Sequence, residues 1–135
     1  MRLAELEIPA RAEFVSLARL VISSIADDRY VLGDDQLDNL KLAVSEACVM
    51  VINAQAGRAR EGSIFVECTG SARRIEVVVD SGAREGAIQK DEGQAEVEDL
   101  GLSLMRSLVD RIALEPHGSG ARLRLTVDCE ESDEL

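Results

Sequence analysis

The spacing of apolar residues changes several times along this chain, and these changes constrain its fold more than any other feature. Between Ala4 and Ile8 apolar and acidic residues alternate, which is typical of a strand with one buried face, and Pro9 ends the strand. From Glu13 onward the apolar residues recur every three or four positions, at Phe14, Leu17, Val21 and Ile25. This spacing predicts an amphipathic helix that ends around Asp28 and packs its apolar stripe on a sheet.

A second helix is predicted after the polar turn Gly33-Asp34-Asp35, whose carboxylates suit a helix N-terminus. It runs to about Ala54, and one face of it is apolar, with Leu37, Leu40, Val44, Ala47, Cys48 and Val51. Two alternating runs follow, 64–68 and 75–79, separated by a turn at Gly70-Ser71. They predict a β-hairpin.

The C-terminal half combines a long irregular segment with one more helix and strand. Residues 81–99 contain glycines and acidic residues without apolar periodicity, which favours a mobile lid or binding loop. A third helix is predicted over 102–112, then a turn at 116–120 and a last strand over 121–127. Strands separated by whole helices predict an α+β fold, a two-layer sandwich with the helices packed on one face of a mixed, mainly antiparallel sheet.

Charge and composition exclude several classes of function. The chain has 135 residues, with 15 Lys and Arg against 26 Asp and Glu, which gives a net charge of −11. Such a surface repels nucleic-acid phosphates and anionic bilayers, so we expect neither as a direct partner. The cysteines Cys48, Cys68 and Cys129 form no C-x-x-C pair and indicate buried thiols in a reducing compartment. With no signal-peptide or membrane-span pattern, a cytoplasmic location is expected.

Glu46 and Asn53 are polar residues in a segment of the second helix, 42–54, that is otherwise nearly all apolar. Helical spacing puts both on a second face, away from the apolar seam. If the helix is covered on both sides, that face lines something polar, because an unpaired buried carboxylate is costly. The alternative is that Glu46 points to solvent, as glutamates usually do.

Two further motifs suit a nucleotide. In Asp80-Ser81-Gly82 a buried strand ends on a carboxylate that can accept a hydrogen bond from a purine amino group, and Gly82 lets the backbone approach a flat ligand. Gly101 lies at the start of the third helix, where free N–H groups and the helix dipole favour phosphate. Each motif alone also fits an ordinary turn or helix start.

The order of these features resembles one known family. Glu46 on a helix, Asp80-x-Gly82 after a strand, a long loop, Gly101-Leu102 at a helix start and Gly118-Ser119-Gly120 before a last strand occur together. This arrangement resembles the anti-sigma-factor switch kinases, the serine-kinase branch of the GHKL ATPase superfamily, from Leu6 to Val127. The phrases 37–47 and 102–110 are especially similar. The resemblance implies the GHKL (Bergerat) ATPase fold, with a histidine-kinase-like ATPase domain over 1–128 and an acidic tail over 129–135.

The resemblance also implies roles for individual residues. Glu46 corresponds to the candidate general base near the γ-phosphate, Asp80 to the adenine-binding aspartate, and Gly82 to the glycine beside it. Gly101 and Leu102 correspond to the start of the helix on the phosphate side. ATP or ADP is the implied ligand.

The chain departs from the family pattern at several positions. Met50 occupies the place of the asparagine that ligates Mg²⁺, and a thioether is a poor ligand for this cation. Asn53 follows one turn later, too far to replace that ligand directly, so no metal ligand is expected. Asp99 and Arg84 replace glycines, and Arg84 can compensate the charge that Asp99 brings near the phosphates. Ala121 replaces a threonine. Asn53, one turn after Met50, and Arg84, which can compensate the charge of Asp99, are added to the candidate nucleotide-binding residues.

Three functions remain open at this point. The resemblance favours an anti-sigma regulatory factor that sequesters a sigma factor, is countered by an anti-anti-sigma protein of the STAS type, and has an ATP/ADP pocket of reduced competence. The alternative is an active ATP-dependent serine/threonine kinase that phosphorylates this antagonist. The third is an acidic α+β domain without a pocket. The family also implies a homodimer.

Overall fold

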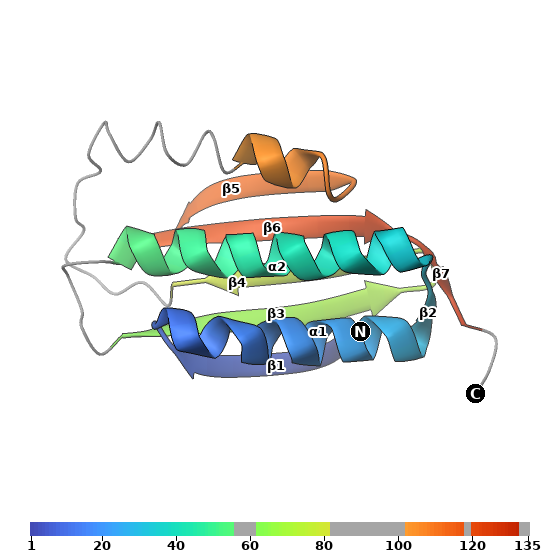
Figure 1. Cartoon of the computed structure of the whole chain (residues 1–135), viewed down its shortest axis with the longest axis horizontal. Coiled ribbons are helices and arrows are strands. Elements are labelled where there is room, and N and C mark those ends of the chain that lie inside the picture. The colour runs from blue at the N-terminus through green and yellow to red at the C-terminus, as the bar shows by residue number, and fades with distance from the viewer. Residues whose placement is uncertain (56–61, 82–101, 118–119, 133–135) are drawn as a thin grey trace.

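A computed structural model of the chain describes residues 1–55, 62–81, 102–117 and 120–132 (Figure 1). The elements, in chain order, are β1 (Arg2–Pro9), η1 (Ala12–Phe14), α1 (Val15–Arg29), β2 (Tyr30–Val31), α2 (Asp34–Gln55), β3 (Ser63–Ser71), β4 (Arg74–Asp80), β5 (Arg111–His117), β6 (Gly120–Asp128) and β7 (Glu130–Glu131). Residues 102–106 are helical. The predicted loop over 81–99 lies, apart from Ser81, outside the described residues.

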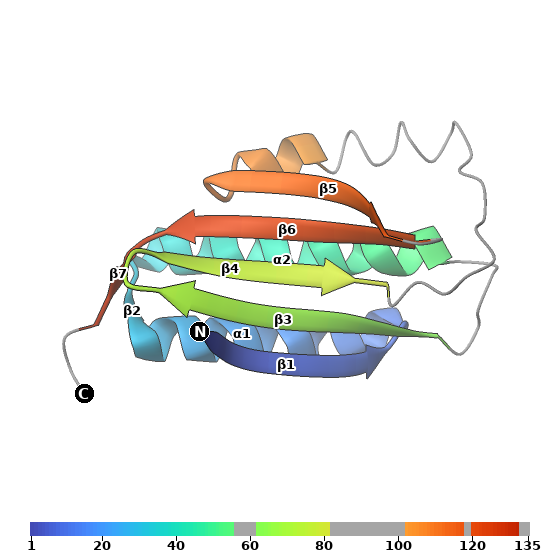
Figure 2. The same cartoon turned by 180° about the vertical axis from the view of Figure 1, so that it is seen from behind.

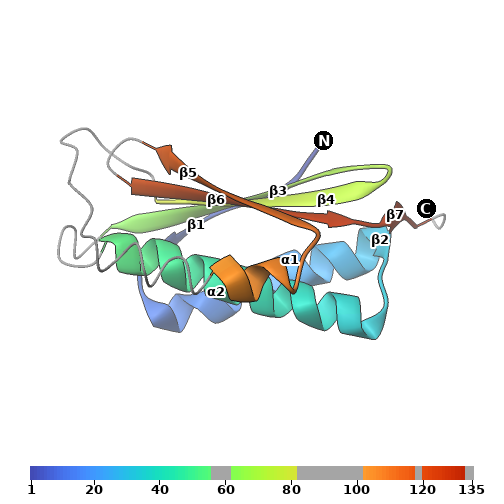
Figure 3. The same cartoon turned by 90° about the horizontal axis from the view of Figure 1, so that it is seen from above.

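The main sheet has five strands in the order β1-β3-β4-β6-β5, and every neighbouring pair is antiparallel. Helices α1 and α2 lie side by side on one face of this sheet, and the helical residues 102–106 lie in the same layer (Figure 3). No described helix covers the other face, which we call the open face (Figure 2). The predicted two-layer α+β sandwich is therefore confirmed.

The core lies between the sheet and the helix layer. Alternate residues of β4, namely Ile75, Val77 and Val79, are buried, and so are their counterparts on the neighbouring strands. The predicted apolar seam of α2 faces them, with Leu40, Val44, Ala47, Cys48 and Val51 all buried. None of the helices in the described part of the chain combines the length and apolar character needed to cross a bilayer.

The buried face of α1 differs from the predicted stripe. Leu17 is 44% exposed, and Phe14, Val21 and Ile25 are only half-buried. The buried residues are instead Val15, Ala18, Ile22, Ser23 and Ala26. The buried face is thus displaced by one residue from the predicted stripe, and three of its five residues are Ala or Ser.

The third helix is shorter than predicted. The helical residues end at Arg106, and Ile112 belongs to β5, an edge strand that runs through Pro116. Proline is tolerated in an edge strand because such a strand has a neighbour on one side only. Leu102, Met105 and Val109 are buried as the helical pattern requires, whereas Ile112 and Leu114 follow the alternation of a strand.

The hairpin is confirmed, but its turn lies at Ala72-Arg73 and not at Gly70-Ser71. Gly70 is part of β3, where a Cβ atom would collide with the hydroxyl of buried Tyr30. This glycine therefore serves close packing and not a turn.

The acidic tail is attached to the domain as far as Ser132. In β7, Glu130 and Glu131 pair with Val31 and Tyr30 of β2. The backbone N–H of Glu131 donates to Ala72 at 3.0 Å, and that of Ser132 donates to Arg29 at 2.8 Å. These hydrogen bonds join the C-terminal segment to the hairpin turn and to the end of α1.

Candidate functional site

Glu46 lies on the outer side of α2, away from the core seam. It is half-buried, and it shares a line along the helix with Leu42, Val49 and Asn53, which are exposed. The sequence left open whether Glu46 is enclosed or points to solvent. Among the described residues it is neither fully enclosed nor fully exposed. Glu46 is thus accessible to a ligand beside α2.

Met50 does not supply a metal site. Its side chain is half-buried and packs against the hydrophobic core. Among the described residues no three His, Cys, Asp or Glu side chains lie close enough together to hold a metal ion. Mg²⁺ requires oxygen ligands in near-octahedral geometry. The described residues at this place in α2 therefore offer no set of oxygen ligands for Mg²⁺.

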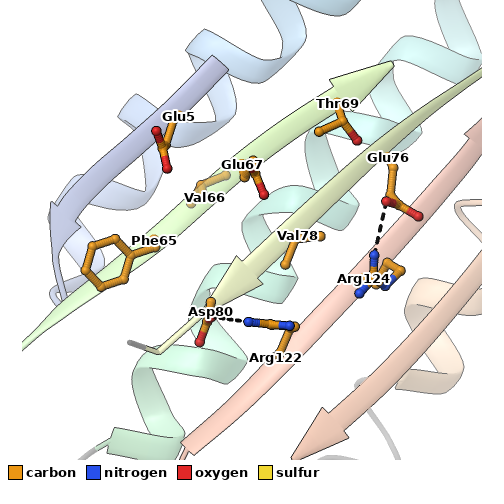
Figure 4. Close-up of a pocket in the computed structure, with 10 residues that line it drawn as sticks. All are labelled: Glu5, Phe65, Val66, Glu67, Thr69, Glu76, Val78, Asp80, Arg122 and Arg124. Carbon is orange, nitrogen blue, oxygen red and sulfur yellow. Dashed lines mark hydrogen bonds and ion pairs between the residues drawn. The ribbon is translucent and has the colours of Figure 1, made fainter. Parts of the chain in front are cut away.

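Asp80 is the last residue of β4, and its side chain lies on the open face. Burial alternates along β4, so Glu76, Val78 and Asp80 point away from the helix layer (Figure 4). The Oδ2 atom of Asp80 lies 3.1 Å from Nη2 of Arg122 on β6. The two side chains are 15% and 31% exposed, respectively. Asp80 is therefore already engaged by a cation, in a partly buried ion pair.

The open face around this pair is a ladder of charges across β4, β6 and β5. Arg124 lies 3.1 Å from Glu76 and 3.5 Å from Glu115. Burial alone would lower the pKa of Arg124, but the two carboxylates raise it above its ordinary value. A shallow cavity of about 330 Å³ lies beside this ladder, bordered by Phe65 and Val78 among others.

The structure does not bring all the predicted site residues together. Glu46 and Asn53 are in the helix layer, whereas the carboxylate of Asp80 lies on the opposite side of the sheet. Leu102 is 7% exposed and belongs to the core. Gly82, Arg84 and Gly101 lie outside the described residues.

Arg122 is the site residue that sequence reasoning missed. The signal was present, since Arg122 and Arg124 alternate with buried leucines on the last strand and must share the open face. What the sequence did not reveal is the register, in which Arg122 lies opposite Asp80.

The three thiols carry no sign of reactivity. Burial raises the pKa of Cys48 to about 12 and that of Cys68 to about 11. Burial, followed by the charge of Asp128, raises the pKa of the half-buried Cys129 to about 11. Since the thiolate is the reactive form, none of these cysteines is suited to act as a nucleophile at neutral pH.

Comparisons with known proteins place these features in a family. The family model of the histidine kinase-like ATPase domain matches residues 8–127. The serine-protein kinase RsbW of Bacillus subtilis (strain 168) is 30% identical over 134 aligned positions, which cover 90% of this chain and 82% of that protein. The serine-protein kinase RsbW of Bacillus pumilus (strain SAFR-032) is 32% identical over 138 positions, covering 92% and 84%.

The match extends from the end of β1 to β6 and so includes α1, α2, β3, β4 and β5. The resemblance found in the sequence is thereby confirmed for the domain, and the two-layer sandwich is consistent with it. The chain belongs to the histidine kinase-like ATPase family.

Proposed function

We propose that this chain is a cytoplasmic anti-sigma regulatory factor. It sequesters a sigma factor, is countered by an anti-anti-sigma protein of the STAS type, and binds ATP or ADP in a pocket of reduced competence. The kinship with serine-protein kinases over most of the chain supports this role. In this proposal the chain also pairs with a second copy of itself.

The nucleotide pocket of this proposal uses the residues named from the family pattern. Glu46 stands nearest the γ-phosphate, and Asp80 accepts a hydrogen bond from the purine amino group. The remaining contacts come from Gly82, Arg84, Gly101, Leu102 and Asn53.

The proposed loss of competence for phosphoryl transfer rests on Met50. Phosphoryl transfer depends almost wholly on positioning and on metal ions that neutralise the developing charge. A thioether packed against the core supplies no oxygen ligand at this position. We therefore expect nucleotide binding without efficient phosphoryl transfer.

The alternative function is an active serine/threonine kinase that phosphorylates the antagonist protein. The names of the relatives favour it, since each is called a serine-protein kinase. The two functions differ in one measurable property, which is the dependence of nucleotide binding and turnover on Mg²⁺.

Isothermal titration with ATP, with and without Mg²⁺, separates these functions. We expect the natural chain to bind ATP with little dependence on Mg²⁺, and Met50→Asn to gain Mg²⁺-dependent affinity because an amide oxygen returns one turn after Glu46. Val49→Asn is the matched control. Val49 precedes Met50 in the sequence, its side chain is 37% exposed, and its position is not the one at which the family has its Mg²⁺ ligand. This variant should leave the Mg²⁺ dependence unchanged.

Two results would overturn the proposal. Robust phosphorylation of an antagonist by the unmodified chain would mean that Met50 is tolerated and the kinase alternative is correct. Absence of any nucleotide binding, in the natural chain and in Met50→Asn alike, would remove the pocket.

A further inference from the structure

We infer that Arg122 is a positioning residue that withholds Asp80 from the purine, so that nucleotide binding has to break the Arg122–Asp80 ion pair. This inference rests on the proposed nucleotide pocket and adds a means of regulating it. It starts from the 3.1 Å contact between Arg122 Nη2 and Asp80 Oδ2 on the open face of the sheet.

The Asp80 side chain points away from the helix layer that contains Glu46. Residues of β4 alternate between the core and the open face, and Asp80 shares the open face with Val78 (Figure 4). Glu46, on α2, lies in the layer on the other side of the sheet. A single ligand that contacts both carboxylates therefore requires Asp80 to leave Arg122 and turn past the end of β4.

The Arg122–Asp80 ion pair is partly shielded from solvent. The Asp80 side chain is only 15% exposed and that of Arg122 31%, so water and salt screen this pair less than a fully exposed one. A ligand that needs Asp80 in the other arrangement binds with an affinity reduced by the fraction of molecules in that arrangement. The ion pair thus lowers the apparent affinity for the purine.

Arg122 keeps a carboxylate neighbour when Asp80 leaves it. In the register of the sheet Arg122 lies between Asp80 on β4 and Glu115 on β5. Glu115 already approaches the neighbouring Arg124 at 3.5 Å. A carboxylate therefore remains across the strand from Arg122, and the exchange does not leave a buried cation without a counter-charge.

Arg124 is a matched control for Arg122. Both side chains project from β6 onto the open face and are similarly exposed, at 34% and 31%. Arg124 is paired with Glu76 and Glu115 instead of Asp80. Replacing either arginine by methionine removes the same charge from the same face. The difference in ADP affinity between the two variants therefore reports on Asp80.

The test is titration of ADP in Mg²⁺-free buffer against the natural chain, Arg122→Met, Arg124→Met and Asp80→Asn. Arg122→Met should bind ADP about three- to tenfold more tightly than Arg124→Met, the range set by one partly buried ion pair. In an Asp80→Asn background the advantage of Arg122→Met should vanish. A merely structural role of Arg122 would not make its effect depend on the carboxylate of Asp80.

The possible failures are distinguishable. A further variant, Asp80→Ala, removes the acceptor for the purine amino group altogether. If Asp80→Ala weakens ADP binding but Arg122→Met binds no more tightly than Arg124→Met, the inference is wrong and the proposed pocket stands. If Asp80→Ala leaves the ADP affinity unchanged, the proposed pocket is wrong as well. Should Arg122→Met not fold, Arg122→Gln tests the same point against Arg124→Gln, since glutamine lacks the charge but keeps a polar head group. It should show a gain that again requires Asp80, and no gain would overturn the inference.

Discussion

Gly70 illustrates how a single residue can be set by a neighbour far away in the chain. A Cβ atom at this position would meet the Tyr30 hydroxyl and would lie 2.9 Å from Leu3 Cδ1. The Tyr30 hydroxyl cannot retreat without cost, because it donates a hydrogen bond to the carbonyl of Ser71 at 2.7 Å. Glycine at position 70 is thus required by packing of β3 against Tyr30 of β2 and Leu3 of β1.

Gly70→Ala should therefore destabilise the fold. We expect the free energy of unfolding to fall by about 1–3 kcal/mol, the usual cost of overpacking a filled site. Urea denaturation measures this value directly. In a Tyr30→Phe background, where the hydroxyl is absent, the same substitution should cost less, and equal costs in the two backgrounds would contradict the role of the hydroxyl.

At the candidate site, sequence reasoning reaches residue types but not side-chain directions. The end of a buried strand identified Asp80 as an acceptor, and the family pattern identified Met50 as a departure. Neither observation reveals that Asp80 faces Arg122, because that contact depends on the register between β4 and β6. Register is a long-range property, and a shift of one residue would move every side chain to the other face.

Among the elements, periodicity predicted α2 and the β3–β4 hairpin well, and it failed where two patterns overlap. The apolar residues of 102–112 fit helical spacing throughout, yet the last of them, Ile112, pairs with Leu125 of β6. Long-range pairing with β6 therefore overrode the local pattern. For α1 the helix was predicted, but the residues that it buries lie one position after the predicted stripe. The direction in which a helix faces depends on the elements packed against it, here α2 and β1.

The short strand β7 and its flanking residues should stabilise the fold through backbone hydrogen bonds. Its segment contributes backbone hydrogen bonds from Cys129 to Arg73 at 3.0 Å, from Glu131 to Ala72 and from Ser132 to Arg29. Deletion of 129–135 removes all of them. We expect a loss of about 1–3 kcal/mol in unfolding free energy, at about 1 kcal/mol for each hydrogen bond.

Thermal and urea unfolding of two truncated chains tests this expectation. Deletion of 133–135 alone keeps the three hydrogen bonds and should leave the midpoints unchanged. If the longer deletion is equally harmless, the β2–β7 pairing contributes nothing to stability, and 129–132 behaves as the simple acidic tail expected from the sequence.

For the whole molecule, the two layers could be predicted because each layer follows from local periodicity. The strand order β1-β3-β4-β6-β5 could not be predicted, since β1 pairs with β3 although both α1 and α2 lie between these strands in the sequence. On the open face, arginines and carboxylates alternate across β4, β6 and β5, which keeps a sheet face that no described helix covers compatible with water.

The net charge of −11 should speed capture of the proposed sigma factor. Sigma factors present basic DNA-contacting regions, so long-range attraction should accelerate their encounter with this acidic chain. Such attraction is screened beyond about 10 Å at 0.1 M salt, and it acts mainly on the association rate. Raising ionic strength should therefore slow capture more than it accelerates release.

Surface plasmon resonance with candidate sigma factors measures both rates. Removal of 133–135 should change the affinity by less than about tenfold, or about 1.4 kcal/mol. Capture that does not respond to salt would contradict electrostatic steering, and a failure to capture any sigma factor would contradict the proposed function itself.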